Sequence, residues 1–212
     1  MTLYKNKYRV ETARLCGWDY SQNGFYFVTL CIINRENLLG HISNENMILN
    51  QYGRIVKECW YDLPNHYHNI NLDAFVVMPN HLHGIVEIDN KMPNNAIIVE
   101  TGFKPVSTQC TFEKPQLKSH GLFEFVRALK TFSARRINEI RNNPVETGLK
   151  PVSTLKSKPK YTTVWQSRFY DHIIRDDASL HRIRNYIVNN PKSWDGDHFN
   201  TTNSVFPSMP RP

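Results

Sequence analysis

The chain has 212 residues and a formal charge of +7, because 26 lysines and arginines outnumber 19 aspartates and glutamates. Hydrophobic residues make up 40% and aromatic residues 12%, which excludes a wholly disordered chain and allows one domain with a sizeable core. No apolar run is long enough to span a membrane and the first residues lack the apolar part of a secretory signal, so we expect a cytoplasmic protein whose charge favours nucleic acid as partner.

The opening residues, 1–20, are polar and basic and follow no helical or strand period. We interpret them as an extended arm that packs or binds DNA. Its cationic DNA-binding candidates are Lys5, Lys7, Arg9 and Arg14. Aromatic and β-branched residues at 25–33 then predict a buried strand. Apolar residues recur at three- and four-residue steps over 47–60, which predicts an amphipathic helix that ends before Pro64.

Two apolar runs in the middle of the chain predict an antiparallel hairpin. They span 70–78 and 81–89, and only Pro79 and Asn80 separate them, which is the length of a tight turn. No regular alternation of strand, helix and strand follows, so we predict an α+β domain. We expect a central antiparallel sheet of four to five strands, two of its central strands from this hairpin, with the helices mainly on one face.

The C-terminal half is expected to add a helix at 120–141, an irregular strand at 162–176 and a helix at 177–189. The first of these helices has an apolar stripe toward the core and a basic side toward solvent, which we expect to bind DNA phosphates. Its DNA-binding candidates are Arg127, Lys130 and Arg135. Residues 1–195 would form a single domain and 196–212 a tail.

The same short sequence occurs in two expected loops, 90–118 and 142–160. VETGFKPVSTQ at 99–109 and VETGLKPVSTL at 145–155 agree at nine of eleven positions. A repeated fold unit would carry its flanking elements with it, and these copies do not. We interpret them as insertions of a repeated DNA element that surface loops tolerate, with a functional pair of loops as the alternative.

The strongest candidate site is His81-Leu82-His83. Residues i and i+2 of a strand point to the same face, so both imidazoles would project together. Two neutral imidazoles side by side are a ready pair of ligands for a divalent metal. Two unrelated polar residues on the wet face of a strand would show the same spacing.

A tyrosine and an asparagine share one face of the last expected helix. Asn190 follows Tyr186 by one turn, so its amide oxygen could complete a metal site beside the phenol. The alternatives are a core tyrosine and an asparagine that caps the helix ahead of Pro191. Asp171 and His172 could orient a metal-bound imidazole, or could be a solvated pair at a strand end.

Three motifs, FVVMPNHLHGIVEI, VWQSRFYDHIIRD and IRNYIVNNP, resemble in order and separation those of the REP-associated tyrosine transposases, relatives of the HUH single-tyrosine transposases. The opening KYRVETARL…WDYSQNGFYFVTLCIINRE is similar too, so the resemblance covers about residues 5–90 and 120–195. It implies a ferredoxin-like HUH endonuclease fold. The residues that it assigns are His81 and His83 as the HUH histidines, Tyr186 as nucleophile and Asn190 as third metal ligand. Many related transposases have a glutamine in the last place, and asparagine is shorter by one methylene.

The resemblance implies a single-strand DNA endonuclease and transposase that cuts and rejoins hairpin-forming palindromic repeats through a 5′-phosphotyrosine intermediate. Mg²⁺ or Mn²⁺ would serve as cofactor, because an octahedral ion keeps positions open for water and phosphate. The partner would be single-stranded or hairpin DNA at the nucleoid, with no membrane involved. The alternatives are a hairpin-binding protein that has lost nuclease activity, and a metal-dependent phosphodiesterase that uses water as nucleophile.

Overall fold

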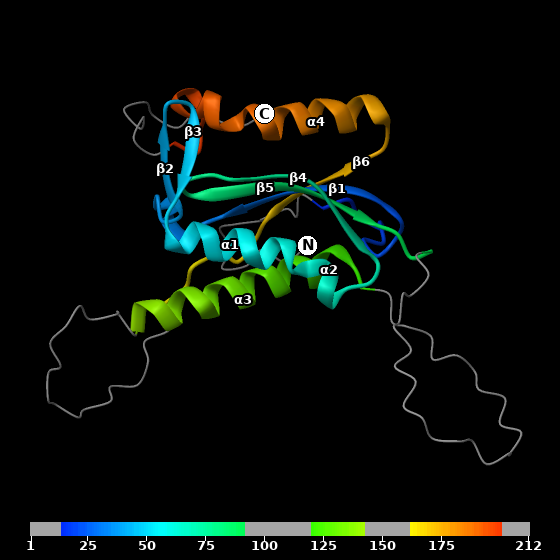
Figure 1. Ribbon diagram of the computed structural model, residues 1–212. Helices are drawn as coiled ribbons and strands as arrows, with labels where there is room; N and C mark the ends of the chain where they lie inside the picture. Colours follow the sequence, from blue (N-terminus) through cyan, green and yellow to red (C-terminus); the bar gives the residue numbers. More distant parts are fainter. Residues whose placement is uncertain (1–13, 92–119, 143–161, 201–212) are drawn as a thin grey trace, which may run out of the picture.

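The computed structural model describes residues 14–91, 120–142 and 162–200. Within these ranges, four antiparallel strands form the central sheet in the order β4-β5-β1-β6 (Figure 1). The strands are β1 Gly24–Cys31, β4 Ile70–Val77, β5 His81–Ile88 and β6 Tyr170–Ile174. The predicted α+β class is confirmed. The expectation that the hairpin supplies two central strands is wrong for β4. This strand lies at the edge of the sheet, and no other strand of the described residues pairs with its outer side.

The helices are divided unequally between the two faces of the sheet. Helices α1 (Gln51–Tyr61), α2 (Leu63–His66) and α3 (Leu122–Asn142) lie on one face, and α4 (Asp177–Asn189) lies on the other (Figure 1). With this strand order, the succession β1-α1-β4-β5-α3-β6 has the ferredoxin-like topology that the motifs implied. No helix in the described part of the chain is long and apolar enough to cross a membrane.

A small hairpin precedes α1, and the sequence reading missed it. Its strands are β2 (Gly40–Ser43) and β3 (Asn46–Leu49). The predicted helix start at Met47 is therefore wrong. The helix begins after Asn50, whose side chain accepts hydrogen bonds from the backbone N–H groups of Tyr52 and Gly53.

Alternation along β1 and β5 gives each face of the sheet its own core. Leu30 and Leu82 point toward α1 and α3, whereas Phe27 and Ile85 point toward α4. At Gly84 a Cβ would lie 2.4 Å from the Trp60 ring, so the indole can pack on β5 only over a glycine. This register places His81 and His83 on the face that α4 covers.

Helix α4 is fixed to the sheet by apolar packing and by an ion pair. Leu180 and Ile187 pack against Phe27, Ile85 and Ile174. The guanidinium of Arg184 donates from Nε to Asp73 Oδ1 on β4 at 2.9 Å, and this hydrogen bond holds the pKa of the Asp73 carboxyl below its usual range. The helix ends at Asn189 as predicted, but a 3₁₀ turn, η2 (Asn190–Gly196), continues through Pro191.

Asparagine side chains hold the described ends that border residues 92–119 and 143–161. Asn69 Nδ2 donates to the backbone oxygen of His120 at 2.9 Å and to Asn90 Oδ1 at 2.8 Å. Asn138 Nδ2 donates to the backbone oxygen of Thr162 at 3.0 Å, and its Oδ1 accepts from Thr162 N at 3.1 Å. The body of the domain therefore closes on itself at both borders, while the expected loops 90–118 and 142–160 lie almost wholly outside the described residues.

Candidate active site

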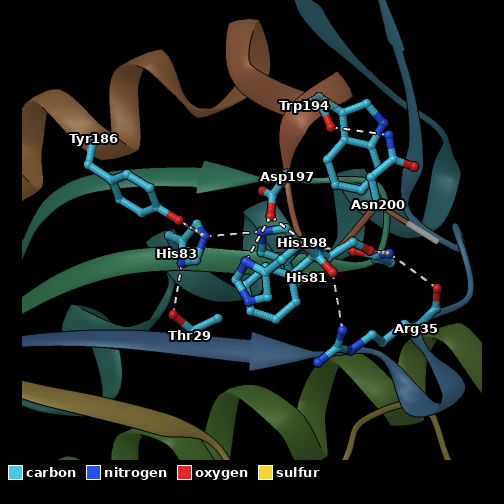
Figure 2. A network of polar contacts seen from close by, with 11 residues as sticks. Thr29, Arg35, His81, His83, Tyr186, Trp194, Asp197, His198 and Asn200 are labelled. Carbon is cyan, nitrogen blue, oxygen red and sulfur yellow. Dashed lines mark hydrogen bonds and ion pairs between the residues drawn. The ribbon is translucent and has the colours of Figure 1, made fainter. Parts of the chain in front are cut away.

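The two histidines of β5, called here the histidine pair, lie side by side under α4 (Figure 2). His81 is 0% exposed and His83 is 2% exposed. Their Nε2 atoms are 3.0 Å apart. Burial lowers the pKa of His81 to about 2 and that of His83 to about 3, so both rings are neutral at physiological pH. Neutral imidazole is the form that binds metals.

Asn80 determines how the His81 ring presents its nitrogens. The Asn80 amide is fully buried, and its Nδ2 donates to the backbone oxygens of Arg35 at 3.2 Å and Phe199 at 2.7 Å. The amide oxygen therefore faces His81 Nδ1, at 2.8 Å, and accepts from it. Because Nδ1 carries the hydrogen of the neutral ring, the Nε2 lone pair of His81 points at His83.

The His83 ring joins the histidine pair to two hydroxyl groups. Its Nδ1 is 2.8 Å from Thr29 Oγ1 on β1, and its Nε2 is hydrogen-bonded to the phenol oxygen of Tyr186 at 3.2 Å (Figure 2). The Phe27 ring stacks on His83 at 5.4 Å between centroids. A threonine hydroxyl can donate or accept, so Thr29 can hold His83 in either neutral tautomer. His83 Nε2 is therefore free to carry a hydrogen or to present a lone pair.

Tyr186 and Asn190 come together at the end of α4, as their spacing predicted. The Tyr186 side chain is half-exposed, whereas Asn190 is 2% exposed. Burial and the carboxylate of Asp197 raise the pKa of the Tyr186 phenol above its ordinary value, and a hydrogen bond from Asn190 acts in the opposite direction. Among the described residues, nothing hydrogen-bonds Asn190 Oδ1, although this atom is buried. A buried oxygen without a partner is costly unless a ligand satisfies it.

The residues present fit a divalent cation. Two donors at about 2.1 Å from one octahedral ion and at right angles to each other are about 3.0 Å apart, which is the separation of the two Nε2 atoms. The buried oxygen of Asn190, which has no hydrogen-bond partner among the described residues, would be a third donor of the harder kind that Mg²⁺ and Mn²⁺ accept. His81, His83 and Asn190 are thus a chemically suitable donor set.

Residues 197–200, called here the C-terminal segment, cover the histidine pair from the side. The Phe199 ring lies 4.4 Å from the His81 ring between centroids, and the Arg35 guanidinium lies 5.0 Å from the centre of the Phe199 ring. The sequence analysis placed this segment in the tail that follows the domain. Figure 2 shows His198 beside the pair, and Arg35 Nη1 donates to its backbone oxygen at 3.3 Å.

A cleft of about 590 Å³ opens beside the phenol of Tyr186. Its walls consist of Phe27, Thr29, Arg35, His83, Tyr170, Tyr186, His198 and Phe199. Aromatic rings and one guanidinium thus surround the edge of the histidine pair. The sequence reading missed Thr29, Asn80, Arg35 and Phe199. Asn80 could have been found from its position directly before His81 in the chain. Thr29 pairs with His83 across the sheet, so a known register between β1 and β5 would have identified Thr29 as a neighbour of His83.

Asp171 and His172 do not contact the imidazoles. Asp171 pairs with Val28 and faces the α3 side of the sheet, 4.0 Å from Arg14 Nε, where burial raises the pKa of its carboxyl. His172 pairs with Phe27 on the α4 side and is exposed, and no described contact joins it to the histidine pair. Thr29 and Asn80 hold the two rings in their place.

The expected DNA-binding residues are spread over the molecule. Lys5, Lys7 and Arg9 lie outside the described residues. Arg14 packs over the Phe123 ring at 4.2 Å. On α3, across the sheet from the cleft, Arg127 and Arg135 are exposed, and Arg135 is paired with Glu139.

Lys130 is hydrogen-bonded to backbone oxygens of a distant segment, which the helical periodicity could not reveal. Its Nζ donates to the backbone oxygens of Gln166 at 2.8 Å and Arg168 at 3.0 Å. Burial lowers its pKa to about 8. The expectation that Lys130 stays in solvent is therefore wrong.

Comparison with known proteins places this chain in a family. A Haemophilus influenzae protein (strain KW20 Rd), named "Uncharacterized protein", is 36% identical over 190 residues, which are 88% of this chain and 91% of that protein. The chain belongs to the family of this protein. No protein-family profile matches it.

Comparison with solved structures identifies the fold. The structure of a REP-associated tyrosine transposase bound to a REP hairpin is similar with a TM-score of 0.50 and 18% identity, over 87% of this chain and 74% of that one. The chain thus has the fold of a REP-associated tyrosine transposase, as its motifs predicted. The structure of a candidate transposase of Deinococcus radiodurans R1 is less similar, with a TM-score of 0.42 and 16% identity over 84% of this chain and 97% of that one.

Proposed function

We propose that this chain is a metal-dependent, single-strand DNA endonuclease and strand transferase that uses Tyr186 as its nucleophile. The observation that carries the proposal is the 3.2 Å contact between the Tyr186 phenol and His83 Nε2, beside a buried neutral histidine pair. Tyr170 is the other phenol of the cleft, but no contact between it and either imidazole is found in the described part of the chain. The fold shared with a REP-associated tyrosine transposase supports the same reading.

His81, His83 and Asn190 would hold the divalent cation, Mg²⁺ or Mn²⁺. Such an ion would polarise a phosphate oxygen and offset the negative charge that develops on the phosphoryl oxygens. The protein prepares for it by keeping both rings neutral and by directing the His81 lone pair into the site through Asn80.

The cleavage step exchanges one phosphodiester bond for another. The phenol oxygen of Tyr186 attacks phosphorus, the bond from phosphorus to the 3′ oxygen breaks, and the phenol proton ends on that oxygen. The products are a 5′-phosphotyrosine and a free 3′ hydroxyl, so the step can run backwards onto another 3′ hydroxyl without ATP. Because the pKa of the Tyr186 phenol is raised, the phenol carries its proton at neutral pH, and the cleavage step includes the loss of that proton.

The cleft supplies groups suited to unpaired nucleotides. Its aromatic walls, Phe27, Tyr170 and Phe199, can stack bases, and Arg35 can pair with a phosphate. A cleft of about 590 Å³ holds a ligand of about one or two nucleotides, so a duplex would remain outside it. We propose that residues 1–13 of the N-terminal arm and Arg35 contribute to binding the hairpin and its flanking strand, with Arg127 and Arg135 as a separate candidate surface.

Replacing Tyr186 with phenylalanine tests the proposal. We expect Tyr186→Phe to abolish cleavage and the covalent protein–DNA adduct formed with Mn²⁺, and to leave hairpin binding nearly unchanged, because only the hydroxyl is lost. Tyr170→Phe is the matched control and should keep the adduct. Cleavage that persists in Tyr186→Phe would mean that water is the nucleophile, and an adduct lost only in Tyr170→Phe would identify the other tyrosine. Hairpin binding without cleavage in the wild type would favour a binding protein.

A further inference from the structure

The repeated segment is sharply delimited. Ten residues, VETGFKPVST at 99–108, recur as VETGLKPVST at 145–154, and the single difference between them is Phe103 against Leu149. The residues on either side differ at once, with Ile98 against Pro144 and Gln109 against Leu155. The duplicated unit is thus a block with abrupt ends.

The genetic code allows this block to be an inverted repeat in DNA. With one choice of synonymous codons, the first copy reads 5′-GTN GAA ACA GGT TTT AAA CCT GTT TCN AC-3′. The right arm, AAACCTGTTTCNAC, is the reverse complement of the left arm, GTNGAAACAGGTTT, when the two N positions are complementary. One base, the third base of the Phe103 codon, remains at the centre.

The amino acids themselves require most of this symmetry. With serine as TCN, first and second codon bases face each other in ten pairs across the centre, and all ten are complementary. Two unrelated bases are complementary about one time in four, so ten such pairs arise by chance on the order of once in a million. The pairing also stops where the protein repeat stops: the second base of the Ile98 codon would face the first base of the Gln109 codon, and these are T and C.

The one difference between the copies follows from the same symmetry. Reversing an inverted repeat leaves its arms unchanged and replaces the central base by its complement. The central codon TTT then becomes TTA, which changes phenylalanine to leucine and keeps the reading frame. Phe103 and Leu149 therefore correspond to the two orientations of one DNA element.

We propose that this inverted repeat is the hairpin DNA that the chain binds and cleaves. The inference rests on the proposed function, because a nuclease of palindromic repeats is the enzyme expected to act on an element of this form. A single strand of the repeat folds back into a stem made of the two arms, with the A·T-rich centre opening as the loop. The stem would stay outside the cleft beside Tyr186, and the adjoining unpaired strand would enter it.

The codons of the gene provide the first test, because selection on the amino-acid sequence does not determine which synonymous third base a codon carries. In the first copy, third bases should be complementary between the codons of Glu100 and Val106, Thr101 and Pro105, Gly102 and Lys104, and Val99 and Ser107. The second copy should show the same pairing, with TTA at Leu149. Unpaired third bases in both copies would overturn the origin that we infer for the segment.

Binding and cleavage of the repeat provide the second test. The full chain is mixed with a single-stranded oligonucleotide that carries the repeat and a short flank, and the dissociation constant is measured with Tyr186→Phe to prevent cutting. The controls are a hairpin of equal length and composition with a scrambled stem, and a strand in which one arm is replaced so that no stem forms. We expect at least tenfold tighter binding of the repeat hairpin, and the strongest Mn²⁺-dependent adduct with it in the wild type.

The outcomes separate this inference from the proposed function. If the scrambled-stem hairpin is bound and cut as well as the repeat, the substrate assignment fails and the nuclease proposal stands. If no hairpin of any sequence forms an adduct, the proposed function fails as well.

Discussion

Acidification should begin to destabilise this protein at a pH above that at which an ordinary carboxylate titrates, because the histidine pair is buried and neutral. An unfolded imidazole has a pKa of about 6.5, whereas burial lowers the pKa of His81 to about 2 and of His83 to about 3. Between these values only the unfolded chain takes up the proton. The stability that the two neutral rings contribute is complete above about pH 6.5 and is lost as the pH falls toward about 3.

The stability lost between pH 7 and pH 5 depends only on the condition that the pKa values of both rings in the folded state lie below 5. Lowering the pH from about 7 to about 5 then costs about 2 kcal/mol for each ring and about 4 kcal/mol for the pair. A domain of this size has a free energy of unfolding of about 5–15 kcal/mol, so the loss is a large fraction of the total. The lowered pKa of Asp73 adds nothing in this window, because that carboxyl takes up protons only at more acidic pH.

Urea unfolding at a series of pH values, with EDTA present, measures this loss. The matched control is the double variant His81→Gln with His83→Gln, in which the loss between pH 7 and pH 5 should largely disappear. Equal slopes for the wild type and the double variant would refute the reasoning, since the histidine pair would then not be the source of the pH dependence.

Three further predictions concern the frame around the site. Arg184→Ala should lower the free energy of unfolding in urea by about 1 kcal/mol, because the ion pair with Asp73 is partly exposed; an unchanged value would mean that apolar packing alone holds α4. Deleting 99–109 should shift the melting temperature by only a few degrees, because Asn69 holds both Asn90 and His120 outside the deletion; loss of cooperative unfolding would contradict this. Removing residues 1–13 should weaken hairpin binding and flatten the salt dependence of Kd, because fewer counterions are released; the same salt slope after truncation would exclude the arm from phosphate contact.

Local periodicity sufficed to predict which site residues share a face. The strand period placed the two imidazoles together, and the helix period placed Asn190 beside Tyr186. The same period shows that Asp171 and His172 point to opposite faces, so they could not both have faced the histidine pair. That conclusion was available from the sequence.

The remaining parts of the site depend on contacts between distant segments. Thr29 reaches His83 only through the β1–β5 register, and the Phe199 carbonyl reaches Asn80 across 119 positions of sequence. Lys130 follows the polar side of α3, yet backbone oxygens of the segment before β6 surround its amine. The β2–β3 hairpin was missed because its two strands are short and the apolar spacing of the second runs on into α1.

The hydrogen bonds of Asn69 and Asn138 at the two borders make these positions suitable for insertion of another domain. The side chains of Asn69 and Asn138 hold the two ends of the chain at each border by hydrogen bonds. We therefore expect that a change in the length of chain between Lys91 and His120, or between Asn142 and Thr162, leaves the geometry of the domain unchanged. The first border follows the end of β5 opposite to the histidine pair, and the second adjoins α3 on the far side of the sheet (Figure 1). A fluorescent reporter domain inserted at either border would sit away from the cleft and could follow the protein on DNA by microscopy.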